Sequence, residues 1–469
     1  MKRPKLYTQL ATLSRKDLRR FGEFVASPYY TRHEETQTFF ATLRKHHPAF
    51  AISDEKLFAQ AFPRRPYDNS RLRVLRTYVL ELLHRFWVVE ELELDAKMKL
   101  RMKIRGLGRQ GLAEEQRKEI VKAKAPLDDK PLGSMPGAYH AYNLAESLVD
   151  SNMRMEKRSA AADVQAMLRR LDEFALGNRL KVLCAVWNQR ANYSFERGDL
   201  GLEETLNLVE RLHLDQQPLI GLYFHLLQLL NDGDHEVHFP ALRKLLRSNQ
   251  GLVESDELVN IFGFLINYCL HANNQGRREF LRVAFETYQE MIALDLLFGQ
   301  GTFSANSYKN ILALGARLKE FTWTRGFLEE NYLRLPERWR DGVFHYGHAY
   351  LDFAEGKYRD AKRHLLEVEF YDQLYRSSHQ ALLLRIYYET DEVEPFFALV
   401  ETFRRYLNRN NDLSAVMITA LQNQVTLTKR IFEFKIGERE ATVDGLRAEI
   451  ASMKPMVDAG WLLEKLAEM

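Results

Sequence analysis

The feature that most constrains the fold of this chain is a repeat of 35 residues in its C-terminal third. Trp323, Tyr358 and Val393 are spaced by 35 residues each time. Other apolar columns share this offset: Ile311/Tyr346/Ala381, Leu314/Ala349/Leu384, Leu318/Phe353/Tyr388 and Leu333/Val368/Phe403. Within each unit the apolar positions run i, i+3 and i+7 and then cross a short turn into a second helix. This pattern predicts stacked helical hairpins, each burying its apolar face on its neighbours.

The repeat is regular only over about residues 306–406, because a frame 35 residues upstream places Gly276 and Glu279 in apolar columns. The alternative, that a helical protein gives such spacings by chance, stays open at this point. If the repeat is real, one set of side chains packs the hairpins together. We expect this set to be Leu318, Trp323, Phe353, Tyr358, Ala361, Tyr388 and Val393.

One unit, HYGHAYLDFAEGKYRDAKRHLLEV, resembles a tetratricopeptide (TPR) repeat. Gly347 and Tyr350 match the small and aromatic positions of its first helix. Gly356, Tyr358 and Ala361 match the turn and the packing alanine of its second helix. The first helix is two residues longer than in the motif, and the two neighbouring units lack the Gly and Ala positions. The resemblance is therefore to TPR-like helical repeats rather than to strict TPRs.

Two longer stretches carry a more specific resemblance. LSRKDLRRFGEFVASPYY near the start and LLLRIYYETDEVEPFFALVETFRRYLNRN near the end resemble a family of uncharacterised bacterial helical-repeat proteins. This similarity spans most of the chain. It implies a fold and says little about function.

Composition also favours helices throughout the chain. The 469 residues include only 13 prolines and 24 glycines, which is sparse for a protein built from many short strands and turns. We predict an all-α protein, with an N-terminal helical cap followed by a right-handed α-solenoid of TPR-like helical hairpins. The expected domains are a basic helical N-terminal domain (residues 1–105), a polar connecting segment (106–137) and the repeat domain (138–469).

The stretch KMKLRMKIR, residues 97–105, alternates basic and apolar residues and could be read as a strand. Its composition opposes a strand, because Lys, Met, Leu and Arg prefer helices and only Ile104 is β-branched. Glu93 lies four residues before Lys97, and Asp95 four before Lys99, which is a stabilising order on a helix. We therefore expect one long helix from about residue 68 to 105, in which Lys103 and Arg105 lack local partners.

The N-terminal region shows helix-start signals at three polar residues. Ser14, Ser53 and Asp68 each precede an amphipathic run and are good N-cap residues. We expect helices after each of them and a further helix over about residues 34–46. These four helices would form the cap.

Charge is unevenly distributed along the chain despite a net charge of +3. Residues 1–130 hold 28 Lys and Arg against 17 Asp and Glu, whereas the remainder holds 39 against 47. The basic excess could contact a phosphate backbone, or it could dock against the acidic repeat region. Tyr29, Tyr30 and Tyr67 lie near it in sequence and could stack on bases. The candidate polyanion surface consists of Arg15, Lys16, Arg19, Arg20, Arg64, Arg65, Arg71, Arg73 and Arg76.

No catalytic or metal-binding motif stands out. His33-Glu34 begins like an HExxH zinc motif, but Gln37 occupies the position of the second histidine. The close pairs His46/His47, His235/His238 and His345/His348 each lack an obvious third ligand nearby in sequence. The GLGRQG stretch lacks the setting of a phosphate-binding loop. We therefore expect no enzyme, no metal and no cofactor.

Cys184 and Cys269 lie in apolar helical surroundings and outside any CxxC pair, so we expect two buried free thiols in a reducing compartment. The N-terminus has no apolar core of a secretory signal, and no apolar stretch is long enough to cross a membrane. We expect a cytoplasmic location.

Two functions are compatible with these features. The first is a non-enzymatic scaffold or adaptor that binds a protein or peptide on the concave surface of the repeats. The alternative is a nucleic-acid-binding or regulatory protein that uses the basic N-terminal helices, with the repeats as a sensor or recruitment domain. The sequence does not indicate the partner, the biological process or the oligomeric state.

Overall fold

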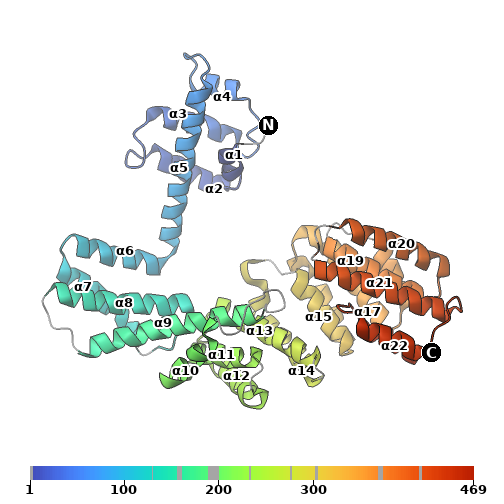
Figure 1. Ribbon diagram of the computed structural model, residues 1–469. Helices are drawn as coiled ribbons and strands as arrows, with labels where there is room; N and C mark the ends of the chain where they lie inside the picture. Colours follow the sequence, from blue (N-terminus) through green and yellow to red (C-terminus); the bar gives the residue numbers. More distant parts are fainter. Residues whose placement is uncertain are drawn as a thin grey trace. The chain divides into compact units, whose positions relative to one another are not determined.

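A computed structural model describes residues 4–128, 130–155, 161–188, 200–231, 234–274, 277–301, 305–367, 373–410, 413 and 415–469. Over these residues the regular structure is helical, with no strand, so the predicted all-α class is confirmed (Figure 1). The chain divides into two compact units. Unit 1 comprises Met1–Lys130 and Pro136–Phe174, and unit 2 comprises Pro131–Met135 and Ala175–Met469.

The helices of unit 1 are α1 (Lys5–Leu10), α2 (Arg15–Ala26), α3 (Glu34–Leu43), α4 (Asp54–Ala61), α5 (Asn69–Leu94), α6 (Ala96–Arg109), α7 (Ala113–Asp128) and most of α8 (Met135–Arg154). Helix α9 (Ala161–Asn188) contributes residues to both units. The first helices of unit 2 after α9 are α10 (Leu202–Arg211), α11 (Pro218–Leu230), α12 (His235–Asn249), α13 (Ser255–Asn274) and α14 (Glu279–Ala293). The remaining helices are α15 (Ala305–Arg317), α16 (Phe321–Asn331), α17 (Glu337–Ala354), α18 (Tyr358–Leu366), α19 (Gln373–Glu389), α20 (Val393–Arg409), α21 (Ala415–Lys435), α22 (Val443–Ser452) and α23 (Ala459–Ala467).

The predicted helix starts of the N-terminal region are confirmed. The side chains of Ser14, Ser53 and Asp68 each accept a hydrogen bond from a backbone N–H in the first turn of α2, α4 and α5. Each bond satisfies one of the N–H groups that a helix start leaves without an intrahelical partner. The core beneath these helices is rich in aromatic rings: Phe21 of α2 contacts Phe40 of α3 and Phe86 of α5.

The expected single helix over residues 68–105 is wrong, because the chain breaks at Asp95. The backbone of Asp95 is extended, and its carboxylate accepts a hydrogen bond from the backbone N–H of Met98. Asp95 therefore ends α5 and starts α6. The charge pairing also differs from the expectation: Lys99 pairs with Glu93 across the break, and Lys103 pairs with Glu119 of α7.

The segment 106–137, expected to be a polar connection, is largely helical. Helix α6 continues through Gly106 and Gly108 to Arg109, and α7 occupies most of the remainder. Ile104 of α6 and Ile120 of α7 are buried together with leucines of α8. The amphipathic face of α7 thus packs into unit 1, which continues as far as Phe174.

Unit 2 contains a run of helical hairpins that pack in a regular order. Helix α17 contacts α15, α16, α18 and α19, and α19 contacts α17, α18, α20 and α21. The odd-numbered helices from α15 to α21 thus each contact the next odd-numbered helix. The intervening α16, α18 and α20 each pack between two of them.

Most of the 35-residue columns coincide with buried positions in successive odd-numbered helices. Ile311, Tyr346 and Ala381 are buried in α15, α17 and α19, and the column of Leu314 follows the same helices. The column of Leu318 begins one residue after α15 and continues in α17 and α19. Of the packing residues predicted from these columns, Phe353, Ala361 and Tyr388 are buried, and Leu318, Trp323 and Tyr358 are half-buried.

Two members of the columns do not pack as expected. Val393 is 39% exposed because it begins α20, and Leu333, which follows α16, is 58% exposed. Their apolar character matches the columns, but their positions at helix ends leave them in contact with solvent. Val368 lies outside the described residues.

Both cysteines are buried and free, as predicted. Cys184 lies in α9 and Cys269 in α13. Burial raises the pKa of the Cys269 thiol to about 12 and also raises that of Cys184. Both side chains therefore behave as small apolar groups.

Helices α15 and α16 approach so closely that one position tolerates only glycine. A Cβ atom placed on Gly315 would lie 2.0 Å from Oγ1 and 3.0 Å from Cβ of Thr324. Thr324 is fully buried and β-branched, so it has little freedom to move away. A Cβ atom placed on Gly326 of α16, in contrast, would have no neighbouring atom within 4 Å.

We predict that Gly315→Ala destabilises the protein by about 1–3 kcal/mol, the usual cost of overpacking a core. The matched substitution Gly326→Ala should raise stability by up to about 1 kcal/mol, because alanine is the better helix former. Urea denaturation followed by circular dichroism measures both. Equal effects of the two substitutions would contradict the close packing of α15 on α16.

Candidate functional site

The short C-terminal helix α23 covers charged side chains at the carboxyl end of α19. Trp461 of α23 is 8% exposed, and its ring lies 5.1 Å from that of Tyr388. The Trp461 Nε1–H donates a hydrogen bond of 2.9 Å to Glu389 Oε1. Lys465 Nζ lies 2.9 Å from the same carboxylate oxygen. Glu389 is thereby held by two groups of α23.

Arg385, one turn before Glu389 on α19, is enclosed in a similar way. Its guanidinium carbon lies 4.4 Å from the ring centroid of Phe353 and 5.0 Å from that of Trp461. Arg385 Nη1 is 2.7 Å from a carboxylate oxygen of Asp458, the residue before α23. Only 10% of the Arg385 side chain is exposed. A buried charge is costly unless it is paired, and here α23 and its N-terminal flank supply the pairing.

The pKa of Lys465 reflects this environment. Burial alone would lower it, but hydrogen bonds to Glu468 and Glu389 outweigh burial and raise the pKa above the ordinary value. Lys465 therefore stays charged over the physiological range.

Helices α15 and α19 also make a contact across α17. Lys309 Nζ of α15 donates a hydrogen bond to Ser378 Oγ of α19, and it lies 5.8 Å from the ring centroid of Tyr346 on α17. Side chains of α15 and α19 therefore meet beside α17. Helix α23 lies near Glu389, at the opposite end of α19 from Ser378.

The nine residues predicted to form a polyanion surface are distributed over α2, α5 and the turn before α5. Five of them have acidic partners. Arg65 and Arg71 share Glu35, and Arg76 binds Asp54 and the Tyr7 hydroxyl. The two remaining pairs are Arg20–Glu90 and Arg19–Glu23. Hydrogen bonds from Arg65 and Arg71 lower the pKa of Glu35, so this carboxylate remains ionised.

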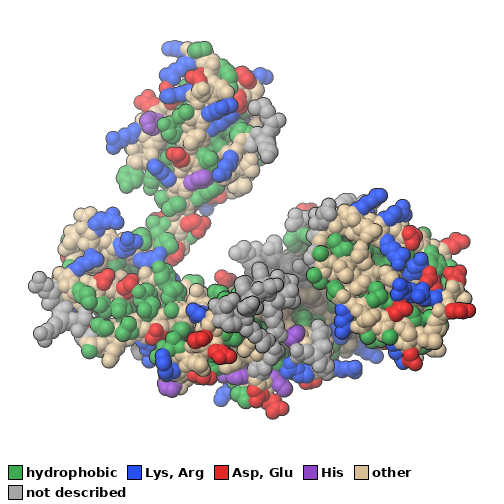
Figure 2. Space-filling view, in the orientation of Figure 1, with side chains coloured by type: hydrophobic (Ala, Val, Ile, Leu, Met, Phe, Trp, Pro, Cys, Tyr) green, Lys and Arg blue, Asp and Glu red, His purple; other side chains and the backbone are tan. Residues whose placement is uncertain are grey.

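The other four residues are exposed and form no ion pair with any described residue. They are Arg15, Lys16, Arg64 and Arg73. On the face drawn in Figure 2, the Lys and Arg side chains of the N-terminal helices are scattered among acidic and apolar ones. Of the nearby tyrosines, Tyr30 stacks on Phe24 of the core, whereas Tyr29 is 87% exposed.

Glu35 offers a direct test of whether this surface binds nucleic acid. If it does, Glu35→Gln should strengthen binding of a DNA duplex, because it releases both Arg65 and Arg71 for phosphate contacts. Each added contact should steepen the slope of log K against log salt by about 0.9. Fluorescence anisotropy at several salt concentrations measures the slope.

Glu34→Gln is the matched control, since it removes the same charge from an exposed neighbour that forms no ion pair with a described residue. Equal effects of the two substitutions would mean that only net charge matters. No duplex binding by any of the proteins would contradict the polyanion interpretation.

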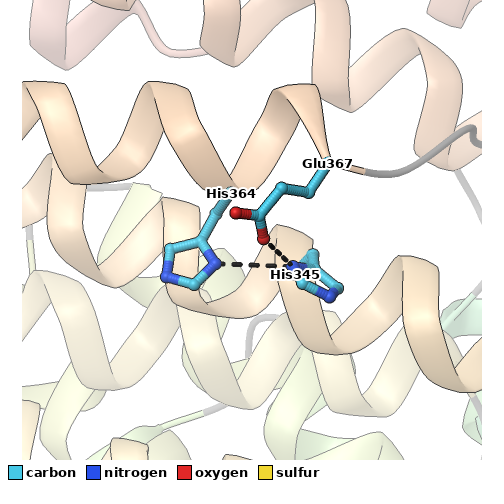
Figure 3. A group of neighbouring side chains, drawn as sticks. All are labelled: His345, His364 and Glu367. Carbon is cyan, nitrogen blue, oxygen red and sulfur yellow. Dashed lines mark hydrogen bonds and ion pairs between the residues drawn. The ribbon is translucent and has the colours of Figure 1, made fainter.

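A second group of polar side chains lies between α17 and α18. His345 Nδ1 is 3.4 Å from His364 Nδ1 and 3.3 Å from a carboxylate oxygen of Glu367 (Figure 3). These three groups are the set among the described residues with the spacing and chemistry to hold a metal ion. Both histidine side chains are partly buried, and Glu367 is exposed at the end of α18.

Two neighbouring side chains, His348 and Asp352, lie beside His364. The rings of His348 and His364 stack with centroids 5.2 Å apart. Burial lowers the pKa of both, which favours their neutral forms. Asp352 Oδ2 lies 3.8 Å from His364 Nε2, and the Arg325 guanidinium lies 2.6 Å from Asp352 Oδ1.

The histidine pairs read from the sequence do not correspond to those in the structure. His345 pairs with His364 rather than with His348, and His238 lies 3.0 Å from His225 rather than pairing with His235. The structural partners come from adjacent helices, so neighbouring sequence positions could not identify them. His364 and Glu367 lie three residues apart near the end of a helix, and this spacing was the one sequence signal that pointed to the cluster.

No protein-family model matches this chain, and neither does any curated protein or solved structure. Within the described ranges, none of the helices has the length and apolar character needed to span a membrane.

Proposed function

We propose that this protein is a non-enzymatic, cytoplasmic scaffold that binds a helical segment of a partner protein. The proposed binding surface is the part of α17 and α19 that α23 covers. The proposed architecture of unit 2 is a right-handed superhelix of TPR-like hairpins, supported by the packing order of α15 to α21. The sequence resemblance to bacterial helical-repeat proteins points to the same architecture.

The observation that carries the proposal is the way α23 binds to α19. A short amphipathic helix inserts one aromatic anchor, Trp461, and meets buried charges of both signs, Arg385 and Glu389. This is the chemistry of helix recognition: a central aromatic residue in a desolvated setting, with charged pairs that fix orientation. A partner helix with an aromatic residue and a basic residue one turn later could make the same contacts.

In this proposal α23 competes with the partner for the surface. Suppose that the partner binds only molecules in which α23 has left the surface. The apparent affinity then equals the intrinsic affinity multiplied by the fraction of molecules in that state. Loss of the Trp461 side chain should weaken the cover, since truncating a buried aromatic residue costs about 3–5 kcal/mol. The partner should therefore bind the Trp461→Ala variant more tightly than the unmodified protein.

The test is affinity capture from lysate of the source cells with the unmodified protein and with Trp461→Ala, followed by mass spectrometry. We expect one protein to be enriched by Trp461→Ala, and to be lost when Arg385→Gln is added. Arg359→Gln is the matched control, because Arg359 is an exposed arginine of α18 outside this surface. Circular dichroism verifies that each variant is folded.

Two outcomes would contradict the proposal. One is that no protein is captured by either form. The other is that capture is insensitive to Arg385→Gln, which would place the binding surface elsewhere.

A second candidate function is nucleic-acid binding by unit 1, with the repeats as a recruitment or sensor domain. The observation in its favour is the set of four exposed basic residues without described acidic partners, Arg15, Lys16, Arg64 and Arg73. The pairing of the other five reduces the free positive charge, so we rank this function second. The Glu35→Gln experiment described above tests whether unit 1 binds nucleic acid.

A further inference from the structure

Three potential metal ligands converge where α17 and α18 face each other. His345 belongs to the middle of α17, His364 to the last turn of α18, and Glu367 immediately follows α18 (Figure 3). One nitrogen or oxygen atom from each lies within 4.8 Å of the other two. Two of the three separations are 3.4 and 3.3 Å.

These two separations match the edges of a tetrahedral zinc site. Zinc binds histidine nitrogen and carboxylate oxygen at about 2.0–2.2 Å, so ligand atoms around a tetrahedral ion are about 3.3–3.5 Å apart. The third pair of ligand atoms lies within 4.8 Å, and the Glu367 side chain, which is 47% exposed, is the least enclosed of the three ligands.

Hydrogen bonding alone accounts poorly for the arrangement. An imidazole nitrogen carries either one proton or one lone pair in the ring plane. His345 Nδ1 faces both His364 Nδ1 and the Glu367 carboxylate, so it can make a well-aligned hydrogen bond to only one of them. A cation placed between the three atoms interacts favourably with all of them, because each then offers a lone pair.

A second observation comes from the far side of His364. Metal-binding histidines usually donate their other ring N–H to a carboxylate or carbonyl, which fixes the tautomer and strengthens the ligand. Asp352 Oδ2 lies 3.8 Å from His364 Nε2, the nitrogen that faces away from the cluster. Arg325 holds Asp352 in place through its other carboxylate oxygen. The 3.8 Å separation is longer than a hydrogen bond, so Asp352 lies beside His364 as a candidate outer partner that is not bonded to it.

We propose that His345, His364 and Glu367 bind a single divalent transition-metal ion, with zinc the best match. Two imidazoles and one carboxylate form a ligand set that suits Zn²⁺, and they leave a fourth position for water or a ligand from a partner. The ion joins the end of α18 to the middle of α17. It therefore stabilises this hairpin at a place separate from the α23-covered part of α17 and α19.

The test uses the full-length chain without a histidine tag, stripped of metal with a chelator that is then removed. Isothermal titration with zinc chloride should show one ion bound per chain with micromolar or tighter affinity. His345→Gln and His364→Gln should each weaken binding by more than the roughly 10–100-fold that loss of an outer partner causes, and Asp352→Asn should cause that smaller loss. Zinc should also raise the melting temperature of the unmodified protein and not that of the two histidine variants.

His225→Gln is the matched control. His225 and His238 form a second close histidine pair, with Nδ1 atoms 3.0 Å apart, but the described residues supply no third ligand there. This variant should bind zinc as the unmodified protein does. The proposal is overturned if the unmodified protein takes up no zinc, if both histidine variants keep full affinity, or if His225→Gln alone abolishes binding.

Discussion

The burial of charge inside the hairpin run is the constraint on which the C-terminal part of this protein depends. Helix α19 contacts helices on several sides, and residues Ala381–Ile386 are all buried. Arg385 is one of these residues, and the Glu389 side chain is only 9% exposed. Without partners these charges would strongly oppose folding. Asp458, Trp461 and Lys465 supply the partners, and α23 also packs on α21 and α22 and buries Leu462 and Leu466.

Other charged side chains are paired in the same way. Arg325 is held between Asp352 and Glu355, and Arg76 lies between Asp54 and the Tyr7 ring. Acidic residues within each unit therefore neutralise much of the basic charge that the sequence displays. His345, His364 and Glu367, in contrast, bring together two imidazoles and a carboxylate, which is the chemical basis for the proposed metal site.

Several features of the fold could be predicted from the sequence because they depend on local chemistry. Helix starts at Ser14, Ser53 and Asp68 follow from side chains that accept hydrogen bonds from nearby backbone N–H groups. The break at Asp95 uses the same chemistry, but the charge pattern around it favoured a continuous helix. The buried columns through Ile311 followed from helical periodicity.

The candidate sites depend on contacts between residues far apart in sequence. Glu35 meets Arg65 and Arg71, and Trp461 meets Glu389, across 30 or more positions. Periodicity identifies which face of a helix is apolar, but it does not show which charged side chain lies opposite. The sequence therefore did not reveal the acidic partners of five of the nine basic residues, nor the pairing of His345 with His364.

Hydrogen–deuterium exchange of the full-length protein measures most directly whether α23 protects α19, because it reports the opening of each helix separately. If α23 protects α19, Trp461→Ala should increase exchange in α19 as well as in α23. Leu463→Ala, at a 42% exposed position of α23, should change neither. Faster exchange in α23 with unchanged exchange in α19 would contradict a protective role of α23.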